Sequence, residues 1–88
     1  MRAKKDVILR EIAGEHILVP VGGNAADFMG IMTLNDSGMF LWELLLRQDC
    51  TEEMLVQALL DEYEVERPTA AADVRALLEM LQNVRLLE

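Results

Sequence analysis

The chain has 88 residues, of which 52% are hydrophobic and 27% are charged. This length lies below the usual ~100–200 residues per domain, so we expect residues 1–88 to form one domain around one modest core. Sixteen acidic residues against eight basic ones give a net charge of −8. That balance disfavours autonomous binding to nucleic acid, which needs cations to replace the counterions of phosphate groups.

The excess negative charge is confined to the second part of the chain. Residues 1–34 carry four basic and four acidic residues and are neutral, so residues 35–88 hold the whole charge of −8. An acidic half beside a neutral half suits contact with a basic protein surface, or simply solubility, and solubility is the commoner reason.

The cysteine content and the N-terminus indicate the compartment. The lone Cys50 can form neither an internal disulfide nor a cysteine-based zinc site, which indicates a reducing environment. No long apolar stretch follows the basic residues at the N-terminus, so no signal peptide is predicted. The longest apolar run in the first third, residues 17–21, is too short to span a membrane. We therefore expect a cytoplasmic protein without a membrane segment.

Two apolar runs around a short turn predict an antiparallel hairpin near the N-terminus. Residues 7–12 and 15–21 are rich in β-branched and aliphatic side chains, and Ala13-Gly14 separates them. Ile17, Val19 and Val21 alternate along the second run, and we assign them to the side that faces the core. Residues 22–30 are expected to form a loop, and a short third strand is predicted over 30–34.

At Asn35 the hydrophobic period changes from two to about 3.6, which predicts helices. We expect them near residues 36–47, 51–64 and 69–84, with Asn35 and Thr51 as N-caps and Pro68 in a first helical turn. Trp42 is expected in the core. The predicted fold class is α+β, with a three-stranded antiparallel sheet followed by a three-helix bundle.

The passage from the third strand into the first helix is distinctive. Residues 34–45 read LNDSGMFLWELL, and this segment closely resembles the PqqD family, named for pyrroloquinoline quinone biosynthesis protein D. The similarity continues through Thr51-Glu52-Glu53 and the acidic run 61–64 to residues 73–81 and Leu86-Leu87, and it spans about residues 7–87. One position departs: relatives usually place a glycine where this chain has Arg85, so we expect the third helix to end differently, through Asn83.

The resemblance implies a winged-helix-like domain that binds the leader of a ribosomally made precursor peptide. Such domains present the precursor to a modifying enzyme, often a radical S-adenosylmethionine protein, and need no cofactor of their own. The leader adds as a strand beside the third strand, in a groove walled by the third helix. The residues expected to bind it are Gly30, Ile31, Met32, Thr33, Asp73, Ala76, Leu77 and Met80.

Few side chains suggest catalysis or metal binding. His16 is the only histidine and has no recognisable partners for catalysis or ligation, so it is interpreted as a strand residue. Acidic neighbours raise the pKa of a thiol, so Cys50 is expected to be inert. The acids over residues 52–66 have the spacing of helix ends and solvated faces. Met29 and Met32 fit either a peptide groove or ordinary packing.

Three other classes of function were weighed. A winged-helix nucleic-acid binder or regulator is the main alternative, but its recognition helix would offer only Arg75 and Arg85 against Asp73 and Glu79. A small enzyme lacks a nucleophile–base pair. A dimerisation module, giving a homodimer, is supported only by the expected edge strand.

Overall fold

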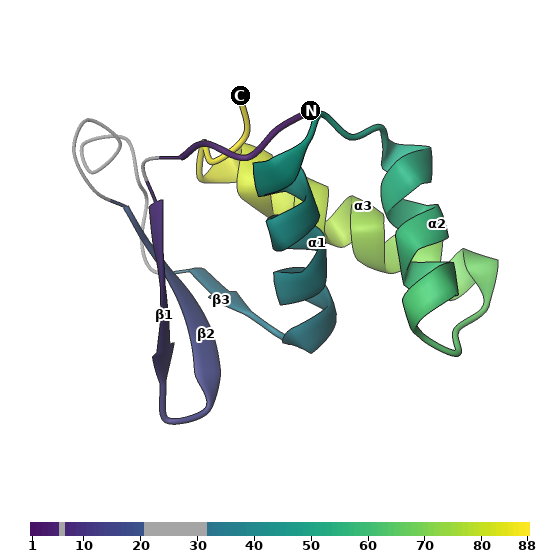
Figure 1. Ribbon diagram of the computed structural model, residues 1–88, viewed down its shortest axis with the longest axis horizontal. Helices are drawn as coiled ribbons and strands as arrows, with labels where there is room; N and C mark the ends of the chain where they lie inside the picture. Colours follow the sequence, from purple (N-terminus) through teal and green to yellow (C-terminus); the bar gives the residue numbers. More distant parts are fainter. Residues whose placement is uncertain (6, 21–31) are drawn as a thin grey trace.

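The computed structural model describes residues 1–5, 7–20 and 32–88. In chain order its elements are β1 (Val7–Ile12), β2 (Glu15–Pro20), β3 (Met32–Leu34), α1 (Asp36–Arg47), α2 (Glu52–Glu62) and α3 (Arg67–Asn83). This order confirms the predicted fold, with strands first and helices after them (Figure 1). The predicted loop over 22–30, together with Val21, Gly30 and Ile31, lies outside the described residues.

The three strands form one antiparallel sheet in the order β1-β2-β3. β1 and β2 meet at a two-residue turn in which Ala13 and Gly14 both have positive φ, 53° and 83°. This is the backbone of the tight hairpin turns that match the right-handed twist of strands, and Gly14 adopts it without steric cost. The register pairs Leu9 with Leu18, and Leu18 with Met32.

The prediction for the core-facing side of β2 was wrong. Leu18 is fully buried, whereas Ile17 and Val19 are only partly buried and lie on the opposite side of the sheet. Directly paired residues share a side, so Leu18 and Met32 together face the core. Ile17 and Val19 therefore lie on the outer side of the sheet. Periodicity alone could not show which side is buried, because both sides of this strand carry apolar residues.

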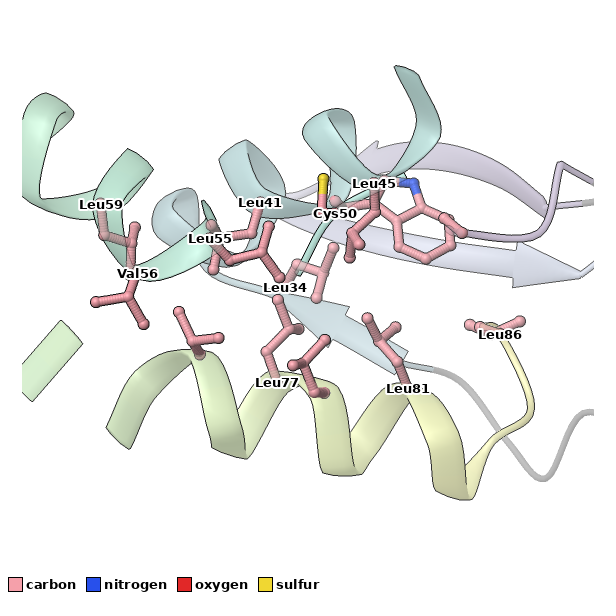
Figure 2. Close-up of a cluster of buried hydrophobic side chains, with 14 of the residues drawn as sticks. Leu34, Leu41, Leu45, Cys50, Leu55, Val56, Leu59, Leu77, Leu81 and Leu86 are labelled. Atoms are coloured by element: carbon pink, nitrogen blue, oxygen red, sulfur yellow. The ribbon is translucent and has the colours of Figure 1, made fainter. Parts of the chain in front are cut away.

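The core lies between the sheet, α1 and α2 on one side and α3 on the other. Figure 2 shows Leu41 of α1 and Leu55 of α2 pointing toward Leu77 of α3, with Leu34 of β3 among them. Trp42 is 1% exposed, as predicted for a core residue. The N-caps agree with the sequence, since Thr51 Oγ1 accepts a hydrogen bond from the Met54 amide at 3.1 Å.

We expected the third helix to end through Asn83, but in the structure a different residue takes the conformation that ends it. Arg85 itself takes the left-handed conformation, with φ of 60°, and the Leu86 amide donates to the Leu81 carbonyl at 2.8 Å. This arrangement ends a helix by satisfying its last carbonyls, usually with glycine at the left-handed position. The backbone therefore keeps the left-handed conformation for which relatives usually have a glycine, and in this chain Arg85 adopts it.

The two ends of the described chain lie side by side (Figure 1). Ala3 forms an antiparallel bridge with Leu87, and the Lys4 amide donates to the Leu86 carbonyl at 2.9 Å. The Ala3 amide also donates to the Leu45 carbonyl at 3.0 Å. The N-terminal segment thus joins the end of α1 to the segment after α3.

Replacing Trp42 by alanine should lower the free energy of unfolding by ~3–5 kcal/mol, because a large, fully buried side chain leaves a cavity. Urea denaturation followed by circular dichroism measures the change. Glu43→Ala, at the exposed neighbouring position, is the matched control and should stay within about 0.5 kcal/mol of the parent. A loss below ~1 kcal/mol for Trp42→Ala would contradict its place in the core.

Candidate functional site

β3 is an edge strand of the sheet. Within the described part of the chain it pairs only with β2, through Ile17 opposite Thr33 and His16 opposite Leu34. The backbone groups on the other side of an edge strand have no partner in the sheet and can pair with another extended chain. β3 is anchored by the buried side chains of Met32 and Leu34, while Thr33 is exposed.

A groove of about 190 Å³ runs beside this strand, between the β3–α1 junction and α3. Five of the residues predicted to bind a peptide line it together: Thr33, Asp73, Ala76, Leu77 and Met80. The four on α3 are spaced at i, i+3, i+4 and i+7, which places them on one face of the helix. Leu77 is buried, whereas Met80 is 47% exposed, so an apolar thioether stands open to solvent at the groove.

The other predicted site residues are placed differently. The side chain of Met32 is 4% exposed, belongs to the core and does not line the groove. Its alternative interpretation as a packing residue therefore fits the structure. Gly30, Ile31 and Met29 lie outside the described residues.

The sequence analysis missed the contribution of the β3–α1 junction to the groove. Five further residues line it: Leu34, Asn35, Ser37, Gly38 and Leu41. Asn35 was recognised as an N-cap, but not as part of the site. Its Oδ1 accepts hydrogen bonds from the Gly38 amide at 2.8 Å and from Ser37 Oγ at 3.1 Å. The cap fixes the residue at which α1 begins. The groove forms beside this residue because α3 lies on the other side of the core and supplies the opposite wall.

Gly38 keeps this junction compact. A Cβ at this position would lie 3.0 Å from Asn35 Oδ1 and 3.4 Å from a methyl group of Leu34. A larger side chain would therefore press on the cap and on the buried anchor of β3 at once. The glycine lets the first turn of α1 approach the end of β3 closely.

Outside the groove, the described histidine and cysteine lie apart from one another, each with its own surroundings. His16 Nε2 lies 3.3 Å from Asp36 Oδ1, an exposed carboxylate at the start of α1. Cys50 is buried, and burial raises the pKa of its thiol, with the adjacent Asp49 adding to the effect. The described residues contain no group of three or more His, Cys, Asp or Glu side chains able to hold a metal ion. In the same part of the chain, no helix has the length and apolar character needed to cross a membrane.

Comparisons with known proteins agree on one family. The family model of coenzyme PQQ synthesis protein D (PqqD) matches residues 15–87. The solved structure of TbiB1 in complex with the TbiA(beta) leader peptide is 31% identical, with a TM-score of 0.72, covering 100% of this chain and 95% of that one. Lasso peptide synthetase B1 complexed with the leader peptide is 26% identical, with a TM-score of 0.65, covering 92% and 88%. A comparison with curated protein sequences returns no match.

Replacing Asn35 by alanine should destabilise the protein by about 1 kcal/mol, because the Gly38 amide loses its acceptor at the start of α1. Asn35→Asp keeps an acceptor at the same place and should stay close to the parent protein. Urea denaturation of the two variants makes the comparison. Equal stability of Asn35→Ala and the parent would show that the cap does not hold the junction.

Proposed function

The chain belongs to the family of coenzyme PQQ synthesis protein D (PqqD), and from this we propose that it binds the leader of a ribosomally made precursor peptide without catalysing a reaction. The observation that supports this most directly is the edge strand β3 beside a groove walled by α3. Two solved relatives with the same fold hold leader peptides. Their likeness extends over nearly the whole of this chain.

In this proposal the leader adds to the sheet as a fourth strand beside β3. Strand addition takes affinity from backbone hydrogen bonds and selectivity from pockets that receive alternate side chains. β3 offers the unpaired backbone, and the groove offers Ala76, Leu77 and Met80 as an apolar wall with Asp73 at one side. The leader side chains that point toward α3 are therefore mainly apolar.

The bound leader then delivers the precursor to a separate modifying enzyme. On the helices, Arg67 pairs with Glu53 at 2.7 Å and Arg75 with Glu52 at 3.4 Å. Residues 35–88 carry twelve acidic residues but only four arginines and no lysine, so most of these acids have no basic residue of this segment to neutralise them. This acidic surface suits a basic face on the enzyme, which in this family is often of the radical S-adenosylmethionine type.

Nucleic-acid recognition is the weaker alternative, because α3 would have to serve as the recognition helix. Its groove-lining charge is Asp73, and Arg75 is engaged with Glu52. A phosphate backbone would therefore meet a face without the cations that binding requires.

Strand addition can be tested by N-methylating single amides of the leader. The probe is a synthetic leader peptide from a candidate precursor, sought among the genes that flank this chain's gene. Amides along a strand alternate between the paired and the open side, so the sensitive positions should recur at every second residue. Each sensitive position should lose about 1–3 kcal/mol, or roughly five- to 150-fold in affinity, by calorimetry. Uniform or absent losses would contradict binding as a strand.

The place of binding can be tested with two methionines of similar exposure. Met80 is 47% exposed at the groove, and Met54 is 42% exposed on α2, away from it. Met80→Ala should weaken leader binding by about fivefold, because the leader covers part of that side chain, roughly 1 kcal/mol of apolar burial. Met54→Ala should leave the affinity unchanged. Equal effects of the two substitutions would move the binding site away from α3.

A further inference from the structure

A second hollow lies next to the groove, past the Leu34 end of β3. We call it the α2 cleft; its volume is about 380 Å³, and its walls come from the start of α1, the end of α2 and Asp73 of α3. Figure 1 shows the start of α1 and the end of α2 both in the lower part of the view. Of the residues that form it, only Asp73 was predicted from the sequence to bind a peptide.

The apolar wall of the α2 cleft is formed by Leu59, Tyr63 and Val65. Leu59 is buried, and Tyr63 is held by an edge-to-face contact with Phe40 of α1, with ring centroids 5.9 Å apart. Val65 is 37% exposed, and its neighbours in the chain on both sides are glutamates. A fixed aromatic ring beside an exposed valine provides a preformed seat for an apolar side chain.

The rim of the α2 cleft is acidic. Asp36 and Asp73 line it, and Glu64 and Glu66 flank Val65 in the chain. Among its described lining residues there is no lysine or arginine. The closest arginine in sequence, Arg67, is engaged elsewhere, with Glu53 at 2.7 Å and Gln57 at 3.4 Å. The rim therefore favours a cationic group on whatever enters.

The α2 cleft is continuous with the groove, since Asn35, Ser37 and Asp73 line both. A strand advances about 3.3 Å per residue, so a peptide paired with β3 would reach the α2 cleft within a few residues of leaving Leu34. This continuity identifies the leader itself as the occupant.

We propose that the leader extends beyond β3 into the α2 cleft, seats an apolar side chain on Val65 and Tyr63, and places a lysine or arginine against the acidic rim. The inference rests on the proposed leader binding and adds a second determinant of selectivity to it. A leader would then be chosen by the apolar residues that face α3 and also by an apolar–basic pair that follows at one end.

The apolar contact is tested by Val65→Ser, with Ile12→Ser as the control at an exposed apolar position on the hairpin. Calorimetry with the synthetic leader should show a loss of about three- to tenfold for Val65→Ser and no change for the control. Melting curves of both variants establish that they are folded. The leader is then shortened at each end in turn. One of the two shortened peptides should bind the parent and Val65→Ser equally, because the residue that couples to Val65 has been removed.

The negative charge around the α2 cleft is tested by Glu64→Lys, at the exposed position just before the cleft-lining Val65, with Glu43→Lys on the exposed face of α1 as the matched reversal of charge. Glu64→Lys should lower leader affinity by about two- to fivefold at low salt, and the difference should shrink as salt screens the charges. Replacing the basic residues of the leader by glutamine should remove the effect of Glu64→Lys.

The outcomes separate this inference from the proposed function. If the parent protein does not bind the leader, the proposed function fails. If it binds and Met80→Ala weakens binding while Val65→Ser and Glu64→Lys do not, only the extension into the α2 cleft is overturned. If Val65→Ser keeps leader affinity but loses binding to the modifying enzyme, the α2 cleft belongs to the enzyme and the inference is likewise overturned.

Discussion

The junction between β3 and α1 holds the edge strand and the first helix in place around one residue, Asn35. Asn35 ends the strand and caps the helix in one residue, through hydrogen bonds to the Gly38 amide and Ser37 Oγ. Just before it, the buried side chain of Leu34 fixes the end of β3 in the core. Because the strand ends and the helix starts at this point, its geometry sets how β3 and α1 lie relative to each other. The groove is the space between this junction and α3.

An edge strand beside an apolar groove is a liability for a small protein, since it can pair with copies of itself. Here the exposed side chain among the described residues of β3, Met32–Leu34, is the polar Thr33. The net charge of −8 also makes copies repel one another. These features keep an open pairing site compatible with solubility. A basic, extended leader peptide would not be repelled in this way and could pair with β3 as a further strand of the sheet.

The arrangement divides recognition between elements of different rigidity. The backbone of β3 is held by the core, so its hydrogen-bonding groups are fixed before a peptide arrives, which lowers the ordering cost of binding. The side chains that would discriminate among peptides lie on α3, at Met80 in the groove, and in the segment between α2 and α3, at Tyr63 and Val65 in the α2 cleft. Substitutions there can change selectivity without disturbing the strand. This separation suits a scaffold that serves different precursors in different relatives.

The sequence alone determined the order of elements and the caps at Asn35 and Thr51, because capping and helical periodicity act over a few residues. The same periodicity, together with the family resemblance, indicated one face of α3, which carries Asp73, Ala76, Leu77 and Met80. The core-facing side of β2 did not follow, since Leu18 and its neighbours are all apolar and only packing against the helices decides which side is buried. The end of α3 did not follow either, because Arg85 adopts a left-handed backbone conformation that glycine usually occupies. The contribution of the junction to the groove, and the α2 cleft beside it, arise where segments distant in sequence meet, and only the tertiary structure brings them together.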